Sequence, residues 1–145
     1  MTQTVSDTGI DGLMQSVYDL GRVMRKRMLM CDTGEIHMGQ LHALLVIQEK
    51  PGITMKELAD ALRVTSPSAT SFIDRLVKLG YVARVHDEIN RRLVRLSISP
   101  SGMKILKRKM TERRKIFAEI LGKLPAADQE ALLQILRKVI ARTSS

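Results

Sequence analysis

The sequence has few aromatic residues, one cysteine and no long apolar run. It contains no tryptophan, two tyrosines and two phenylalanines. Single-stranded nucleic acids are usually bound by stacking on interleaved aromatic side chains, so a single-strand binder is disfavoured. The lone Cys31 cannot form an internal disulfide, which predicts a reducing cytoplasmic location. No run of about 18 apolar residues is present and the first ten residues lack signal-peptide features, so neither membrane insertion nor secretion is predicted.

Acidic residues are also scarce. The 145 residues include 24 Lys and Arg but only 15 Asp and Glu, giving a net charge of +9. Residues 84–115 alone hold eleven of the basic residues and three acidic ones. This excess favours a polyanionic partner, most often nucleic acid, although a solvated, solubilising face is the alternative. The length fits one domain with a sizeable core.

The spacing of apolar residues predicts a mostly helical chain with one small hairpin. Thr54 and Glu57 form a capping-box pattern at the start of a short helix, and Thr65 or Ser66 caps the next one. Gly80 ends that helix, after which apolar and polar residues alternate as in strands. The expected helices cover 10–30, 37–49, a segment from 55, 66–79, 99–122 and a segment from 125, and the expected strands cover 81–86 and 93–98.

Two of these helices have the spacing of a helix-turn-helix motif. They meet at residues 63–65, after a helix of only eight or nine residues. Short hydroxyl side chains at the start of the second helix allow close approach to a DNA groove and hydrogen bonding to base edges. A plain packing hairpin is the alternative. The residues expected to face the major groove are Ser66, Pro67, Ser68, Thr70 and Ser71.

A basic hairpin follows the motif, which predicts a winged helix. Arg91 and Arg92 lie in the loop between the strands, where they can enter a minor groove or bind phosphates. The alternative is that they are solvated turn arginines paired with Asp87. Arg63 and Arg75, at either end of the second helix, are expected to bind phosphates.

These segments resemble the MarR family of transcriptional regulators. The resemblance covers about residues 36–110, and its most specific parts are Ile73-Asp74-Arg75-Leu76, Leu79-Gly80-Tyr81-Val82 and Arg91-Arg92. Two positions depart from the family pattern: Ser71 stands where Arg is frequent, and Asn90 where Asp is frequent. Ser71 removes an expected DNA contact, and Asn90 removes a carboxylate expected to hold the wing arginines, so the target sequence and the wing geometry should differ.

The resemblance implies a winged helix-turn-helix domain at 37–98, flanked by dimerisation helices at 1–36 and 99–145. It also implies a homodimer that binds a palindrome in double-stranded DNA, and a repressor released by a small anionic or phenolic ligand or, in some members, by thiol oxidation. Tyr18 and Met28 are weak candidates for lining the ligand pocket.

No other chemistry is predicted. His37 and His42 are five residues apart and do not share a helix face, so no metal site is expected. Cys31 is expected to be an inert thiol, with redox sensing as the alternative. No phosphate loop or nucleophile motif is present, so no catalytic residue, cofactor or enzyme activity is expected. Two further functions stay open: a DNA-coating protein without sequence preference, and a protein-interaction module.

Overall fold

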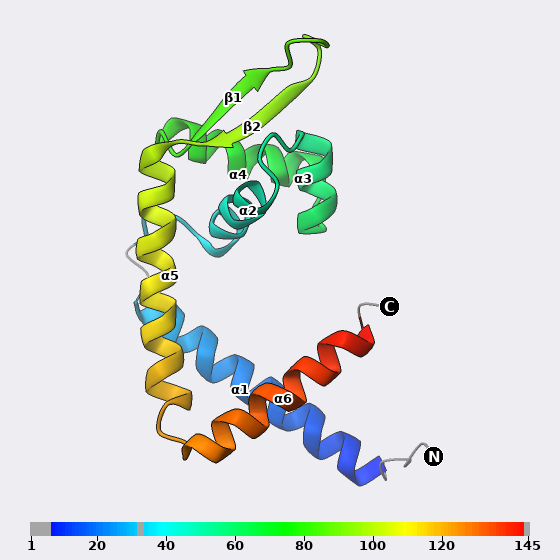
Figure 1. The fold of residues 1–145 in the computed structure, drawn as a ribbon, viewed down its shortest axis with the longest axis vertical. Helices are drawn as coiled ribbons and strands as arrows, with labels where there is room; N and C mark the ends of the chain where they lie inside the picture. The colour runs from blue at the N-terminus through cyan, green and yellow to red at the C-terminus, as the bar shows by residue number, and fades with distance from the viewer. Residues whose placement is uncertain (1–6, 32–33, 144–145) are drawn as a thin grey trace. The chain divides into compact units, whose positions relative to one another are not determined.

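The computed structural model describes residues 7–31 and 34–143. The chain forms two compact units (Figure 1): one from the segments up to Cys31 and from Glu112 onward, the other from the residues between them. We call the described part of the first unit the arm and that of the second the winged unit. The elements in order are α1 Asp7–Met30, α2 Met38–Glu49, α3 Met55–Leu62, α4 Ser66–Lys78, β1 Val82–His86, β2 Val94–Ile98, α5 Pro100–Leu121 and α6 Ala126–Thr143. The predicted mostly helical fold with one antiparallel hairpin is therefore confirmed.

The winged unit has a continuous apolar core. Each of its helices contributes side chains at helical spacing, and the hairpin contributes Val82 and Leu96 from its inner face. The β1 and β2 strands pair antiparallel, from Val82 opposite Ile98 to His86 opposite Val94. The side chains that are essentially inaccessible to solvent are Leu44, Ile47, Ile53, Leu58, Ile73, Leu76, Leu96 and Leu106.

Side-chain caps determine where α3 and α4 begin. The N–H of Glu57 donates to Thr54 Oγ1 (3.3 Å), and the N–H of Thr54 donates to the Glu57 carboxylate (2.9 Å), which confirms the predicted capping box. Lys50 Nζ donates to the same carboxylate at 2.8 Å, and these donors lower the pKa of Glu57 to about 2. Thr65 caps α4 by accepting from the N–H of Ser68.

The hairpin is attached to the helical part of the winged unit through the segment before α3. The N–H of Gly52 donates to the carbonyl of Leu96 (3.1 Å), and the N–H of Leu96 donates to the carbonyl of Ile53 (2.9 Å). Because these bonds continue the sheet on the outer side of β2, the wing is fixed at its base rather than joined only by its chain ends.

The arm has little core of its own. It contains α1, the second half of α5, and α6. Among its described residues, Ile116 is the one buried apolar side chain, and no residue of α6 is buried. Arg27 of α1 forms an ion pair with Glu119 of α5 at 3.0 Å. No helix in the described residues is both long and apolar enough to cross a membrane.

Candidate nucleic-acid interface

The N-terminal half of α4 presents small polar side chains to solvent. Ala69, Ile73 and Leu76 are fully buried and fix one side of the helix to the core. Four of the five predicted base-contacting residues are exposed: Ser66, Pro67, Thr70 and Ser71. These four side chains are therefore accessible to a partner, as base contacts would require.

Ser68 differs from the other four. It is half-buried, and its Oγ accepts a hydrogen bond from the Thr65 hydroxyl at 2.9 Å. Its N–H also donates to Thr65 Oγ1. Ser68 thus contributes to the N-terminal cap of the helix, so a direct base contact would use a hydroxyl that is already held by Thr65.

Two of the predicted phosphate-binding arginines lie at opposite ends of this helix. Arg63 is in the turn before α4, where its backbone is left-handed (φ +52°, ψ +44°), a conformation that is uncommon for residues other than glycine. Arg75 lies in the last turn of α4. Both side chains are exposed, and neither is in ion-pair contact with a carboxylate of the described residues. Their charges are therefore available to a phosphate backbone.

An ion pair between α4 and the wing was not predicted. Arg84 of β1 donates to Asp74 Oδ1 of α4 at 2.5 Å. Asp74 belongs to the Ile73–Leu76 segment that carried the family resemblance. The sequence did not predict its ion pair, because the partner Arg84 lies ten residues away in a different element. The pair links β1 to α4 and neutralises a carboxylate on the surface expected to face DNA.

The loop between the strands is organised around Asp87. Its Oδ1 accepts from the N–H groups of Ile89 and Asn90, each at 2.9 Å. Its Oδ2 accepts from Arg95 Nε at 2.5 Å, and Arg95 Nη1 in turn donates to the Gly52 carbonyl at 2.9 Å. The two N–H groups and the Arg95 guanidinium lower the pKa of Asp87 to about 2. Asp87 thus pairs with Arg95, and within the described ranges it forms no ion pair with Arg91 or Arg92.

Asn90 supplies the acceptor that the wing turn needs. Its Oδ1 accepts from the N–H of Arg92 at 3.2 Å, and its carbonyl accepts from the N–H of Leu93 at 2.8 Å. An amide oxygen can form this turn as a carboxylate would, but without a charge. Both wing arginines are exposed, and neither is in ion-pair contact with a carboxylate of the described chain.

A polar cluster lies at the base of the wing. The Glu35 carboxylate accepts from the Tyr81 hydroxyl and from Arg108 of α5. These donors lower the pKa of Glu35, while its negative charge and hydrogen bond raise that of Tyr81. The carbonyl of Tyr81 also accepts from the N–H of Ser99 at 3.0 Å. Tyr81 therefore connects the end of α4 to the start of α5.

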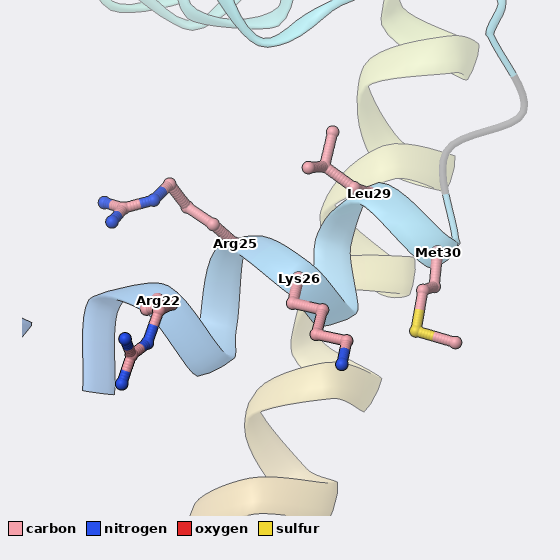
Figure 2. A pocket seen from close by; sticks show the side chains of 5 residues that line it. All are labelled: Arg22, Arg25, Lys26, Leu29 and Met30. Atoms are coloured by element: carbon pink, nitrogen blue, oxygen red, sulfur yellow. The ribbon is translucent and has the colours of Figure 1, made fainter. Parts of the chain in front are cut away.

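The second half of α1 carries a basic hollow (Figure 2). It is lined by Arg22, Arg25, Lys26, Leu29 and Met30, which recur on one face of the helix, and its volume is about 450 Å³. Arg22 pairs with Asp19 at 2.6 Å. The predicted ligand residues Tyr18 and Met28 do not line this hollow: Tyr18 is exposed and Met28 is half-buried. Cys31, just beyond α1, is exposed.

No three potential metal ligands of the His, Cys, Asp and Glu types converge within the described ranges.

Comparison with known proteins gives one consistent result. Residues 36–94 match the MarR family model. The chain is 31% identical over 120 residues to an uncharacterised helix-turn-helix-type transcriptional regulator of Mycobacterium bovis, covering 83% of this chain and 82% of that protein. It is 30% identical over 101 residues to the transcriptional regulator HosA of Escherichia coli O157:H7, covering 70% and 75%.

Solved structures show the same fold. A MarR family protein from Bacillus stearothermophilus superposes with a TM-score of 0.85 at 21% identity, covering 98% of this chain and all of that one. The YusO protein of Bacillus subtilis superposes with a TM-score of 0.78 at 22% identity, covering 95% and 99%. The six helices, the antiparallel wing and the matched segments agree: this chain belongs to the MarR family of DNA-binding transcriptional regulators.

Proposed function

We propose that this regulator is a homodimer that recognises a palindromic site in double-stranded DNA and represses transcription until a small anionic or phenolic ligand releases it. The observation that carries the proposal is the joint presentation of α4 and the wing. The exposed start of α4 and the two wing arginines are attached to the same core, and the Arg84–Asp74 pair connects them. Their relative position is therefore set before DNA is bound.

The proposed contacts divide into base reading and phosphate binding. Ser66, Pro67, Thr70 and Ser71 would enter the major groove, with Ser68 at its edge. Arg63 and Arg75 would bind phosphates on either side, and the wing arginines would enter the neighbouring minor groove. Since Ser71 and the other hydroxyls make short-range contacts, part of the selectivity would come from DNA shape rather than from bidentate base contacts.

The arm would form the dimer. Its helices expose large apolar side chains that a second copy can cover, which supports dimerisation segments at 1–36 and 99–145 around the DNA-binding segment 37–98. A two-fold dimer places two recognition helices about one DNA turn apart, roughly 34 Å. The apolar side chains in question are Ile10, Leu13, Met14, Val17, Tyr18, Val23, Leu133, Leu136, Val139 and Ile140.

The ligand would be an anion with an apolar body. The hollow on α1 offers Arg25 and Lys26 beside Leu29 and Met30, with Arg22 paired to Asp19, which suits a carboxylate or phenolate attached to a ring. Tyr18 and Met28 stay candidates for the same role elsewhere on α1. We further propose a cytoplasmic location, because the proposed target is DNA.

Selection of genomic DNA tests the proposal. The full-length protein is incubated with fragments of its own genome at moderate salt, and bound fragments are sequenced and footprinted. We expect a near-palindromic protected site with two half-sites one turn apart. Retention of DNA without an enriched sequence would support a DNA-coating protein instead, and no retention would support a protein-interaction module.

The serine at the edge of the reading surface gives a sharper test of sequence specificity. Ser68→Ala should change the preference among related DNA sites, because it removes a hydroxyl beside the groove. Thr70→Ala is the matched variant, because it removes a hydroxyl from an exposed position of α4. Selection repeated with each variant measures the change. Identical enriched sequences for both variants and the wild type would contradict base reading by these hydroxyls. Thermal unfolding of Ser68→Ala separates a weakened cap from a lost base contact.

A further inference from the structure

Ile89, at the tip of the wing, is the most exposed large apolar side chain in the described chain. It is 99% exposed, whereas Val85 in the same hairpin is 53% exposed. The other strongly exposed apolar side chains are concentrated on the arm helices, where dimerisation would cover them. Ile89 lies far along the hairpin from the core, so no packing within the winged unit accounts for an isoleucine at this position.

Hydrogen bonds hold the backbone at this position. The N–H of Ile89 donates to Asp87 Oδ1 at 2.9 Å, and Asp87 is held in turn by Arg95. Arg95 is itself bonded to the carbonyl of Gly52, which connects the tip to the segment before α3. The backbone of the tip is therefore held before any partner binds, which reduces the conformational entropy that binding must remove.

The surroundings of Ile89 match one kind of partner. Arg91 and Arg92 follow within three residues, both exposed and without an ion-pair partner in the described chain. An apolar side chain beside unpaired arginines on a narrow projecting hairpin suits the minor groove of double-stranded DNA. There, arginines bind the negative groove edges and an apolar side chain packs against sugars or wedges between base steps.

We propose that Ile89 is a specificity-determining residue that enters the minor groove as an apolar wedge and bends the flank of the site. The proposal rests on the proposed DNA-binding function and adds a contact that depends on how easily the flanking DNA deforms. Pyrimidine–purine steps unstack most readily, so sites with such a step beneath the wing should bind more tightly than sites with a stiff A-tract there.

The salt dependence of binding separates this contact from the arginine contacts. An apolar wedge releases no counterions, so its loss should weaken binding equally at every salt concentration. Loss of an arginine that neutralises a phosphate should also flatten the slope of log affinity against log salt, by about one for each arginine and therefore by about two for a substitution in both wings of the dimer. The two contributions at the same wing can thus be measured independently.

The experiment uses the full-length protein and the DNA site selected above. Affinity is measured by fluorescence anisotropy over a salt series, and bending by energy transfer between the DNA ends. The variants are Ile89→Ala, the conservative Ile89→Leu, Arg91→Ala, and Met38→Ala as a matched exposed apolar residue of α2. For Ile89→Ala we expect an affinity loss of about tenfold over two wings, an unchanged salt slope and a smaller bend. Ile89→Leu should stay within about twofold of the wild type, and Met38→Ala should have no effect.

Three outcomes would overturn the proposal. Wild-type affinity and bending for Ile89→Ala would show that the side chain contacts no DNA. An equal loss for Ile89→Ala and Ile89→Leu would show that the substitution disturbs the tip rather than removing a wedge. Failure of the wild type itself to retain any DNA in the selection would overturn the proposed function as well, and it is distinguished because it is seen before any variant is made.

Discussion

The winged unit and the arm use apolar residues in opposite ways. In the winged unit they converge: all eight of the large side chains that are essentially inaccessible lie between residues 44 and 106. In the arm they remain on the surface: α6 buries none of its residues, although Leu133, Leu136 and Val139 recur on one of its faces. Both units have amphipathic helices, but only the winged unit closes its apolar faces within one chain.

This difference indicates which unit needs a partner. A helix gains most of its stability in water from burying its apolar face, so uncovered helices are marginal alone. An apolar surface of this kind on a monomer marks an interaction site. The winged unit should therefore fold with a stability independent of concentration, whereas the arm should gain stability from association.

The largest expected effect comes from placing a charge on the arm surface. Leu136→Glu introduces a carboxylate at a half-exposed position of α6, and burying it in a dimer without a partner would be strongly unfavourable. We expect sedimentation equilibrium to show a monomer, and binding to the selected palindrome to fall to that of a single half-site. Gln134→Glu adds the same charge at a polar position of the same helix and should leave the dimer intact. A stable Leu136→Glu dimer would contradict the proposed interface.

A core deletion in the winged unit should have the next largest effect. Leu76 is fully buried, and Leu76→Ala should lower the free energy of unfolding by about 2–5 kcal/mol. The loss should be the same at every protein concentration, because the core lies within one chain. Leu136→Ala removes the same atoms from α6, and its effect should shrink as dilution dissociates the dimer, because Leu136 is already half-exposed in the single chain. Chemical denaturation at two protein concentrations measures both, and a concentration-dependent loss for Leu76→Ala would break the comparison.

Substituting one glycine in each unit compares how closely the two units are packed at single positions. A Cβ at Gly102 would lie 2.1 Å from the Tyr81 carbonyl oxygen, so Gly102→Ala must push α5 away from the base of the wing. We expect a loss of about 1–3 kcal/mol in the free energy of unfolding. Gly12 of α1 has no atom within 4 Å of such a Cβ, and Gly12→Ala should stabilise the helix by about 0.5–1 kcal/mol. Destabilisation by Gly12→Ala would instead place the dimer partner against that position.

The sequence was informative where structure depends on neighbouring residues. The Thr54–Glu57 box, the Thr65 cap and Gly80 each act within one turn of chain, and the helices and strands begin and end close to the predicted positions. The features that position the site depend on residues far apart. Arg95 donates to Gly52, 43 residues away, and Glu35 accepts from Tyr81, 46 residues away.

Composition and spacing therefore predicted which side chains are available, but not which of them hold the wing. Arg95 was counted among the basic residues, and the structure shows it to be a fixed support of the wing tip. Ser68 was grouped with the exposed hydroxyls, and its half-burial follows from a bond to Thr65 that spacing alone could not assign.

The smallest expected effect concerns acid, and it also distinguishes the units. The carboxyls whose pKa is clearly lowered among the described residues, Glu35, Glu57 and Asp87, all lie in the winged unit. A lowered pKa means that the stabilisation is present above the ordinary pKa of the group, near 4, and is lost as the pH falls through the folded value. For Asp87 that value is about 2. Acid should therefore loosen the wing tip between about pH 4 and pH 2.

The amide resonances of Ile89 and Asn90 measure this directly, because both N–H groups donate to Asp87. We expect them to shift with a midpoint near pH 2, since protonation of Asp87 weakens both hydrogen bonds and removes the ion pair with Arg95. In Asp87→Asn the same resonances should not titrate in this range, while those next to Glu57 still should. A midpoint near 4 would mean that Arg95 and the two N–H groups do not hold the carboxylate in solution. The bonds to Asp87 would then not fix the wing tip before DNA is bound, and the wing would lack a support that the winged unit's core does not replace.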